Sequence, residues 1–134
     1  MKYKRYCKQL SLKDEPELIA RYKEAHGMGN AWPEITAGMK EIGILDMEIY
    51  ILGNTLFMIM DTIADFDHDD AMQKLSKLPR QKEWENYVAE FQQTDESASA
   101  DQKWQLMERI YEMDQSAVYD ASSGQIKSLL EDRE

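Results

Sequence analysis

Two apolar segments separated by a Gly-Asn pair constrain the fold of this chain more than any other feature. Residues 44–52 read ILDMEIYIL and residues 55–62 read TLFMIMDT. β-Branched and aromatic side chains favour strands, and two strands around such a pair form a tight hairpin. Met47, Ile49 and Ile51 share one face of the first strand, and apolar residues also occupy the opposite face. We therefore expect a sheet covered on both sides, by helices and by a partner subunit.

Strand and helix patterns flank this hairpin on both sides. Residues 4–12 alternate between apolar and polar, as a half-buried strand does. Asp14 is the expected N-cap of the helix that follows, and Pro33 suits the first turn of a second helix. Two further helical patterns lie between 65 and 91. Residues 104–113 alternate as a strand does, whereas Trp104, Met107 and Tyr111 also suit a helix, and the order of elements favours the strand.

This order of elements predicts an α+β domain with a ferredoxin-like, four-stranded antiparallel sheet and helices on one face. Sheets of this kind often pair face to face, so we expect a dimeric α+β barrel. A chain of 134 residues is the size of one domain. We expect that domain at 1–113 and assign no role to the tail at 114–134, in which residues 126–130 are compatible with a short helix.

Composition narrows the functional classes. The formal net charge is −10, whereas nucleic-acid binding and anionic membrane surfaces call for a basic stripe. The longest unbroken apolar run covers only residues 56–60, far short of a membrane span. Cys7 is the one cysteine, so no intrachain disulfide can form, and the first ten residues lack the apolar core of a secretory signal. We expect a cytoplasmic protein with no nucleic-acid or membrane partner.

Tyr22 and His26 are the first candidates for chemistry. Four-residue spacing on a helix brings two side chains to one face, about 6 Å apart. A phenol beside an imidazole can hold a hydroxylated substrate and move its protons. The alternative is a half-buried aromatic and a surface histidine at a helix end. Trp32, just before Pro33, is expected to staple the entry of the second helix or to line a site.

His68 lies among three aspartates, which raises the question of a metal site. Metal ligands must converge, whereas consecutive residues scatter around a helix. The acidic residues also favour a helix N-terminus. We therefore interpret this stretch as a solvated acidic helix start and expect neither a metal nor another cofactor.

Several short motifs, in their order and spacing, resemble the L-rhamnose mutarotase family over most of residues 4–113. The motifs are Tyr22-x3-His26, Trp32-Pro33-Glu34, Gly43 with the following strand that ends in Glu48-Ile49-Tyr50, the strand Leu56-Phe57-Met58, and Gln81-Lys82-Glu83-Trp84. The resemblance implies a dimeric α+β barrel that interconverts the α and β pyranose anomers of L-rhamnose without a cofactor. It also implies that His26 is the proton donor, that Tyr22 contacts the sugar, and that Trp84 is the second residue of a tryptophan pair at the sugar.

The sequence departs from the family pattern at positions that touch sugar. Glu83 stands where the pair has its first tryptophan, Met47 stands where the family has a tyrosine, and the gap between His26 and Trp32 is two residues longer. We include Met47 and Glu83 among the substrate-binding residues and expect a 6-deoxyhexose, either L-rhamnose or L-fucose. Glu83 can accept hydrogen bonds from hydroxyls; the alternative is a solvated helix charge.

Mutarotation has simple chemical needs that a histidine meets. The ring oxygen gains a proton, the anomeric hydroxyl loses one, and a side chain with a pKa near 6.5 can do either at neutral pH. Two other functions fit the same scaffold: another cofactor-free enzyme, or a non-catalytic dimeric module that binds a small molecule or regulates. Convergence of Tyr22, His26 and Trp84 on one pocket would favour the mutarotase. A wholly apolar pocket would favour another cofactor-free enzyme, and a filled core would favour the non-catalytic module.

Overall fold

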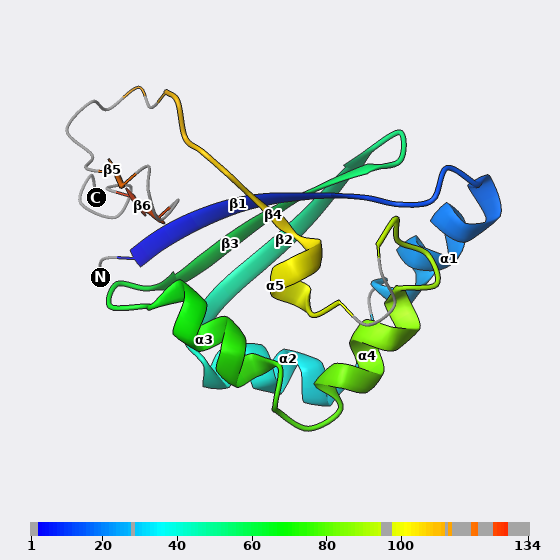
Figure 1. Cartoon of the computed structure of the whole chain (residues 1–134), viewed down its shortest axis with the longest axis horizontal. Helices are drawn as coiled ribbons and strands as arrows, with labels where there is room; N and C mark the ends of the chain where they lie inside the picture. Colours follow the sequence, from blue (N-terminus) through cyan, green and yellow to red (C-terminus); the bar gives the residue numbers. More distant parts are fainter. Residues whose placement is uncertain are drawn as a thin grey trace.

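The computed structural model describes residues 3–27, 29–94, 98–111, 113, 119–120 and 125–128. In these ranges, helices α1 to α4 gather on one side of an antiparallel sheet (Figure 1). The predicted α+β fold is confirmed. In chain order the elements are β1 (Tyr3–Ser11), α1 (Pro16–Ala25), α2 (Pro33–Glu41), β2 (Ile44–Leu52), β3 (Thr55–Ile63), α3 (His68–Leu75), α4 (Gln81–Val88), α5 (Ala100–Lys103), β4 (Gln105–Met107), β5 (Tyr119–Asp120) and β6 (Gln125–Ser128).

Strand β3 pairs with β2 on one side and with β1 on the other, antiparallel in both cases. The predicted hairpin is confirmed: Leu52 pairs with Thr55 across a turn in which Gly53 has a φ of 62°, a conformation that glycine adopts at little cost. The second edge of β1 pairs with β4 at Cys7–Gln9 and with β6 at Tyr3–Arg5. The strands β2, β3, β1 and β4 thus follow the ferredoxin-like order. Strand β6 pairs with the same edge of β1 as β4 does, and β5 pairs with β6.

Three local expectations are wrong. Helix α1 has Glu15, not Asp14, at its N-cap, with no side-chain hydrogen bond, because Pro16 already fixes its first turn. The final strand is short, since β4 pairs with β1 over only three residues. Residues 126–128 of the tail piece that is compatible with a helix instead belong to β6, which gains hydrogen bonds from the free edge of β1, and residues 129–130 lie outside the described residues.

The two faces of the sheet differ in what covers them. Alternate residues of β1 and β3 are buried against the helices, and each large apolar side chain so buried stabilises the fold by about 1.5–3 kcal/mol. On the opposite face Tyr50, Leu52, Phe57 and Met107 are exposed. The main apolar residues of the buried face are Tyr6, Leu10, Leu56, Met58 and Met60 from the strands and Phe66, Met72, Leu75, Val88 and Phe91 from the helices and their connections.

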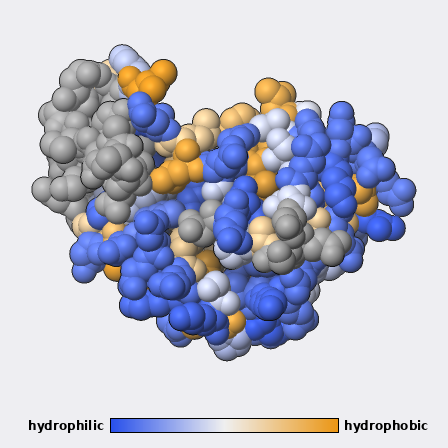
Figure 2. All heavy atoms as spheres, viewed as in Figure 1, coloured by the Kyte–Doolittle hydropathy of each residue, from blue (hydrophilic) through white to orange (hydrophobic). Residues whose placement is uncertain are grey.

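The outer surface of the helices is mainly polar. Hydrophilic side chains cover most of the helical half of the view in Figure 2, with smaller apolar areas between them. This surface carries much of the net charge of −10. Within the part of the chain that the structure describes, no helix is long and apolar enough to cross a membrane.

Candidate active site

A cavity of about 430 Å³ lies between the covered face of the sheet and helices α1, α2 and α4. Four of the five residues expected at the site line it: Tyr22, His26, Met47 and Trp84. The fifth, Glu83, is not among the lining residues and is exposed. The fold therefore brings together residues from α1, β2 and α4 around a space that suits a small ligand.

Helix α1 holds the phenol and the imidazole side by side. Tyr22 is buried at 3% exposure, and its ring centroid lies 4.2 Å from that of His26. His26 is the residue at which the helix ends, and its Nδ1 lies 2.9 Å from the backbone oxygen of Tyr22. A carbonyl oxygen only accepts, so Nδ1 donates and, in the neutral ring, Nε2 keeps its lone pair for a ligand.

The surroundings set the protonation of both groups. Part of the His26 ring is exposed, yet the neighbouring aromatic rings withhold water from it, and this burial lowers the pKa of His26 below its ordinary value. The hydrogen bond to the Tyr22 carbonyl and the charge of Glu85 oppose the shift. Burial raises the pKa of Tyr22, against a hydrogen bond from Gln92 that lowers it. At neutral pH His26 is mainly uncharged and Tyr22 keeps its proton.

Two tryptophans extend this aromatic wall. The Trp84 ring lies 5.2 Å from His26 at an interplanar angle of 70°, and Trp32 lies 5.1 Å from Trp84 in a similar edge-to-face arrangement. Trp32 occupies the N-cap position of α2 and also lines the cavity, so the site-lining alternative holds for it. Indole faces of this kind can pack against the apolar C–H face of a sugar ring.

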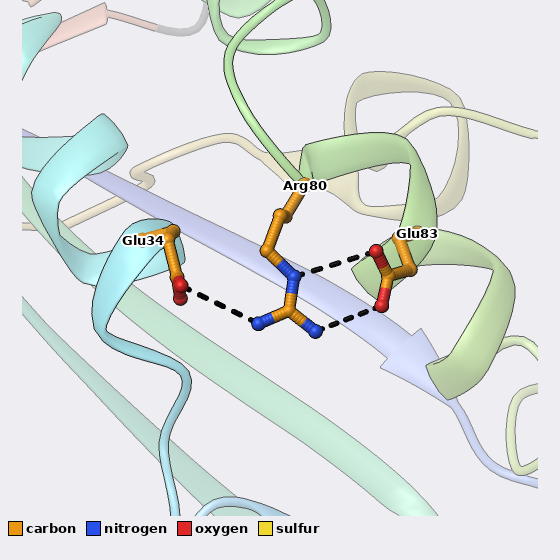
Figure 3. A network of polar contacts seen from close by, with 3 residues as sticks. All are labelled: Glu34, Arg80 and Glu83. Carbon is orange, nitrogen blue, oxygen red and sulfur yellow. Dashed lines mark hydrogen bonds and ion pairs between the residues drawn. The ribbon is translucent and has the colours of Figure 1, made fainter.

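Arg80 ties the first turns of α2 and α4 together beside Trp32 (Figure 3). Its Nη2 and Nε lie 2.8 Å and 3.3 Å from the Glu83 carboxylate, and its Nη1 lies 3.4 Å from Glu34. The guanidinium carbon is 4.2 Å from the centre of the Trp32 ring. The hydrogen bonds from Arg80 lower the pKa of Glu83. Glu83 is therefore engaged in an ion pair at the rim of the site, and its predicted contact with sugar stays a prediction.

A buried ion pair that the sequence did not reveal lies in the wall of the cavity. The carboxylate of Glu85, 8% exposed, accepts a hydrogen bond from Gln81 Nε2 at 2.6 Å and one from Lys103 Nζ at 2.9 Å. Lys103 also donates to the backbone oxygen of Glu85 at 2.7 Å. These bonds join α4 to α5 and hold a fixed negative charge at the edge of the cavity.

Two more buried polar residues line the cavity, Lys8 at 3% exposure and Gln92 at 1%. Lys8 interrupts an otherwise apolar face of the first strand, between Tyr6 and Leu10, and that interruption was a usable sequence signal. Gln92 begins a polar stretch that is typical of a loop, so no local signal marks it. With Glu85 and His26, these residues give the apolar cavity a small number of polar groups.

His68 is buried rather than solvated, which corrects the expectation from sequence. It is 6% exposed, its ring lies 5.1 Å from that of Tyr6, and its Nδ1 lies 2.9 Å from the Asp69 carboxylate. Among the residues that the structure describes, no group of three histidine, cysteine or acidic side chains is arranged to hold a metal ion.

Comparisons with known proteins agree with this geometry. Residues 5–113 match the model of the L-rhamnose mutarotase family. The chain is 30% identical over 116 residues to an L-fucose mutarotase of Xanthomonas campestris pv. campestris, covering 87% of this chain and 93% of the relative. It is 37% identical over 116 residues to a UPF0734 protein of Dictyostelium discoideum, covering 84% and 91%.

A solved structure has the same fold. The crystal structure of an L-rhamnose mutarotase from Formosa agariphila matches with a TM-score of 0.61, over 82% of this chain and 98% of that one, at 22% identity. The family model spans most of the chain, and it includes every residue that we expect at the site. The chain belongs to the L-rhamnose mutarotase family, whose members are sugar isomerases.

Proposed function

We propose that the protein interconverts the α and β pyranose anomers of a 6-deoxyhexose, L-rhamnose or L-fucose, without a cofactor. The observation that carries this proposal is the convergence of Tyr22, His26 and Trp84 on one cavity, with ring separations of 4.2 Å and 5.2 Å. The cavity is neither filled nor wholly apolar. These features favour a mutarotase over a binding module or an enzyme for a purely apolar substrate.

His26 carries the proton transfers in this proposal. Its Nε2 lone pair takes the proton of the anomeric hydroxyl while C1 becomes an aldehyde carbon and the bond from C1 to the ring oxygen breaks. The imidazolium that results gives the same proton to the ring oxygen. After rotation about the C1–C2 bond, the reverse transfers close the ring on the opposite face of the carbonyl. The hydrogen bond from Nδ1 to the Tyr22 carbonyl supports this role, because it fixes the tautomer and the ring orientation.

The remaining residues hold the sugar. In our proposal the Tyr22 hydroxyl donates to a sugar oxygen, and Trp84 packs against the C–H face of the ring. Met47 forms part of an apolar floor with Ile49, Met58 and other residues of β2 and β3. Such a floor suits the methyl group that distinguishes a 6-deoxyhexose from a hexose with a hydroxyl at C6.

We also propose a cytoplasmic homodimer. Support for the dimer comes from the uncovered face of the sheet, where Tyr50, Leu52, Phe57 and Met107 expose 51%, 77%, 36% and 37% of their surfaces. Large apolar side chains exposed together on one face of a sheet favour an interface. A second copy that packs its own sheet against this face would cover it and complete the α+β barrel. Support for the location is the lone cysteine, which needs no oxidising compartment.

Exchange between anomeric protons in NMR tests the proposed function. We expect catalytic amounts of protein to accelerate exchange for L-fucose or L-rhamnose well beyond the rate in buffer. Acceleration should be weaker for L-galactose and L-mannose, which carry a hydroxyl at C6, whereas C6 is a methyl group in L-fucose and L-rhamnose. Exchange at the buffer rate for all four sugars would remove the mutarotase and favour a binding module.

A further inference from the structure

Gln92 is fixed in the cavity wall by the backbone of β1. It forms an antiparallel bridge with Leu12, and the flanking hydrogen bonds are from Lys13 N to Phe91 O at 2.9 Å and from Gln93 N to Ser11 O at 2.9 Å. Residues opposite each other in an antiparallel pair project to the same face. Leu12 is buried at 0% exposure on the helix side, so the Gln92 side chain also lies on that side, among the residues that line the cavity.

The hydrogen bonds of the Gln92 amide are incomplete. A glutamine side chain has two N–H donors and one oxygen that accepts. The amide interacts with the Tyr22 hydroxyl closely enough to lower its pKa, whereas Oε1 has no hydrogen-bond partner among the described residues. The residue is only 1% exposed, so bulk water does not reach it freely. A buried acceptor without a partner is unfavourable, and such groups in proteins usually serve a ligand.

The Tyr22 hydroxyl lies at the same cavity. Burial raises its pKa, so it keeps its proton and can donate to a ligand there. The Tyr22 ring is in contact with His26, with centroids 4.2 Å apart. Gln92 and Tyr22 therefore form an acceptor and a donor side by side, next to the imidazole.

We propose that Gln92 is a specificity-determining residue that accepts a hydrogen bond from one ring hydroxyl of the sugar, beside the Tyr22 hydroxyl, which donates to a neighbouring sugar oxygen. This inference rests on the proposed function and deepens it. The substrate class it names is a pyranose with two adjacent oxygens, one of which must carry a hydrogen. A sugar that lacks this hydroxyl leaves Oε1 buried and unpaired in the complex, so the site rejects it.

Deoxy sugars test the contact. We measure kcat/KM for anomer exchange with the better of L-fucose and L-rhamnose and with its 2-, 3- and 4-deoxy analogues. With the wild-type protein, one analogue should lose about tenfold to a hundredfold, the size of one lost hydrogen bond. Gln92→Met, which keeps the length and removes the polar atoms, should lose a similar factor on the parent sugar and should no longer distinguish it from that analogue.

Gln93→Met is the matched control, because Gln93 is adjacent, exposed and outside the cavity. It should behave as the wild-type protein does. Gln92→Glu keeps an accepting oxygen, so it should retain discrimination against the deoxy analogue, and it serves as the second variant if Gln92→Met does not fold. A purely structural role for Gln92 would lower the rates for all four sugars equally.

Two results would overturn the inference. One is a folded Gln92→Met protein that keeps the wild-type preference among the four sugars; the other is a wild-type protein that treats all three analogues as the parent. Failure of the proposed function is distinguishable, because the wild-type protein would then exchange no sugar. In that case line broadening of the same sugars on titration with wild-type, Gln92→Met and Gln93→Met protein would still decide whether Gln92 contacts them.

Discussion

The two faces of the central sheet differ in their side chains and in what covers them. On the covered face, Met58 and Met60 are 6% and 1% exposed beneath the helices. On the open face, Tyr50 and Leu52 are 51% and 77% exposed. The open face also carries the Arg5–Asp61 ion pair and the Gln9–Gln105 hydrogen bond, so it is only partly apolar. The helices cover one face and leave a cavity there for a ligand, and the other face is available to a partner subunit.

His26→Ala should impair the function of the covered face and leave the open face unchanged, and we expect it to have the largest effect of the substitutions discussed. Loss of the imidazole should slow anomer exchange by about two to four orders of magnitude, the usual contribution of a general acid–base group. Assembly and far-UV circular dichroism should not change, because His26 lies on the covered side. Lys23→Ala, an exposed change one turn earlier in α1, is the control. Wild-type exchange rates in folded His26→Ala protein would remove the imidazole from the mechanism.

Phe57→Glu tests whether the open face forms the dimer interface. Burial of an unpaired carboxylate at an interface costs several kcal/mol, so the variant should raise the dimer Kd by at least about a hundredfold. Light scattering should then report a monomer at micromolar concentration where the wild-type protein is a dimer. Ala20→Glu adds the same charge on an exposed position of α1 and should leave the dimer intact. A wild-type protein that is itself monomeric at that concentration would refute the interface.

The pH dependence should report the covered face alone. Desolvation lowers the pKa of His26 from its ordinary 6.5, with the Tyr22 carbonyl and the Glu85 carboxylate opposing the shift. In the proposed mechanism the neutral ring is the active base, so the rate should be constant above this pKa and fall about tenfold per pH unit below it. We expect the midpoint below pH 6.5. A midpoint above that value, or a rate that rises in acid, would show that the imidazolium is the active form.

Local sequence signals were sufficient for most of the fold and for the centre of the site. The Gly-Asn pair fixes the hairpin, Pro33 starts α2 where expected, and the four-residue spacing puts Tyr22 and His26 in contact. These features depend on neighbours in the chain. The interruption of an apolar strand face by Lys8 is a further local signal of a buried polar group.

The rest of the site depends on contacts between distant residues. Glu85 meets Lys103 eighteen positions later, and Gln92 is placed by a bridge to Leu12. A polar residue in such a pair looks like any solvated residue when only its neighbours are known. Glu83 differs from these residues, because the resemblance to the family predicted that it contacts the sugar. In the structure it forms an ion pair with Arg80. In our proposal the choice of sugar also depends on one of these distant groups, Gln92.

Arg80 lies at the rim of the cavity and outside both faces of the sheet, so its loss should have a smaller effect than the substitutions on either face. It is the one residue other than glycine with a positive φ, 64°, among the described residues. Such a conformation is unfavourable for a side chain and often accompanies a functional position. Its guanidinium covers Trp32, so the ion pairs with Glu34 and Glu83 keep a flat cation against one wall of the site.

Loss of this arrangement should weaken sugar binding modestly, since exposed ion pairs and cation–π contacts are individually weak and are screened by salt. We expect Arg80→Gly to raise KM by about twofold to fivefold with little change in kcat, because Trp32 becomes less ordered while His26 is untouched. Arg80→Ala should show the same KM as Arg80→Gly and a lower melting temperature, since only glycine relieves the positive φ.

Glu83→Gln should have a smaller effect on KM than Arg80→Gly if Glu83 acts only through Arg80. A larger effect of Glu83→Gln, confined to one sugar, would instead support the direct contact that the sequence predicts.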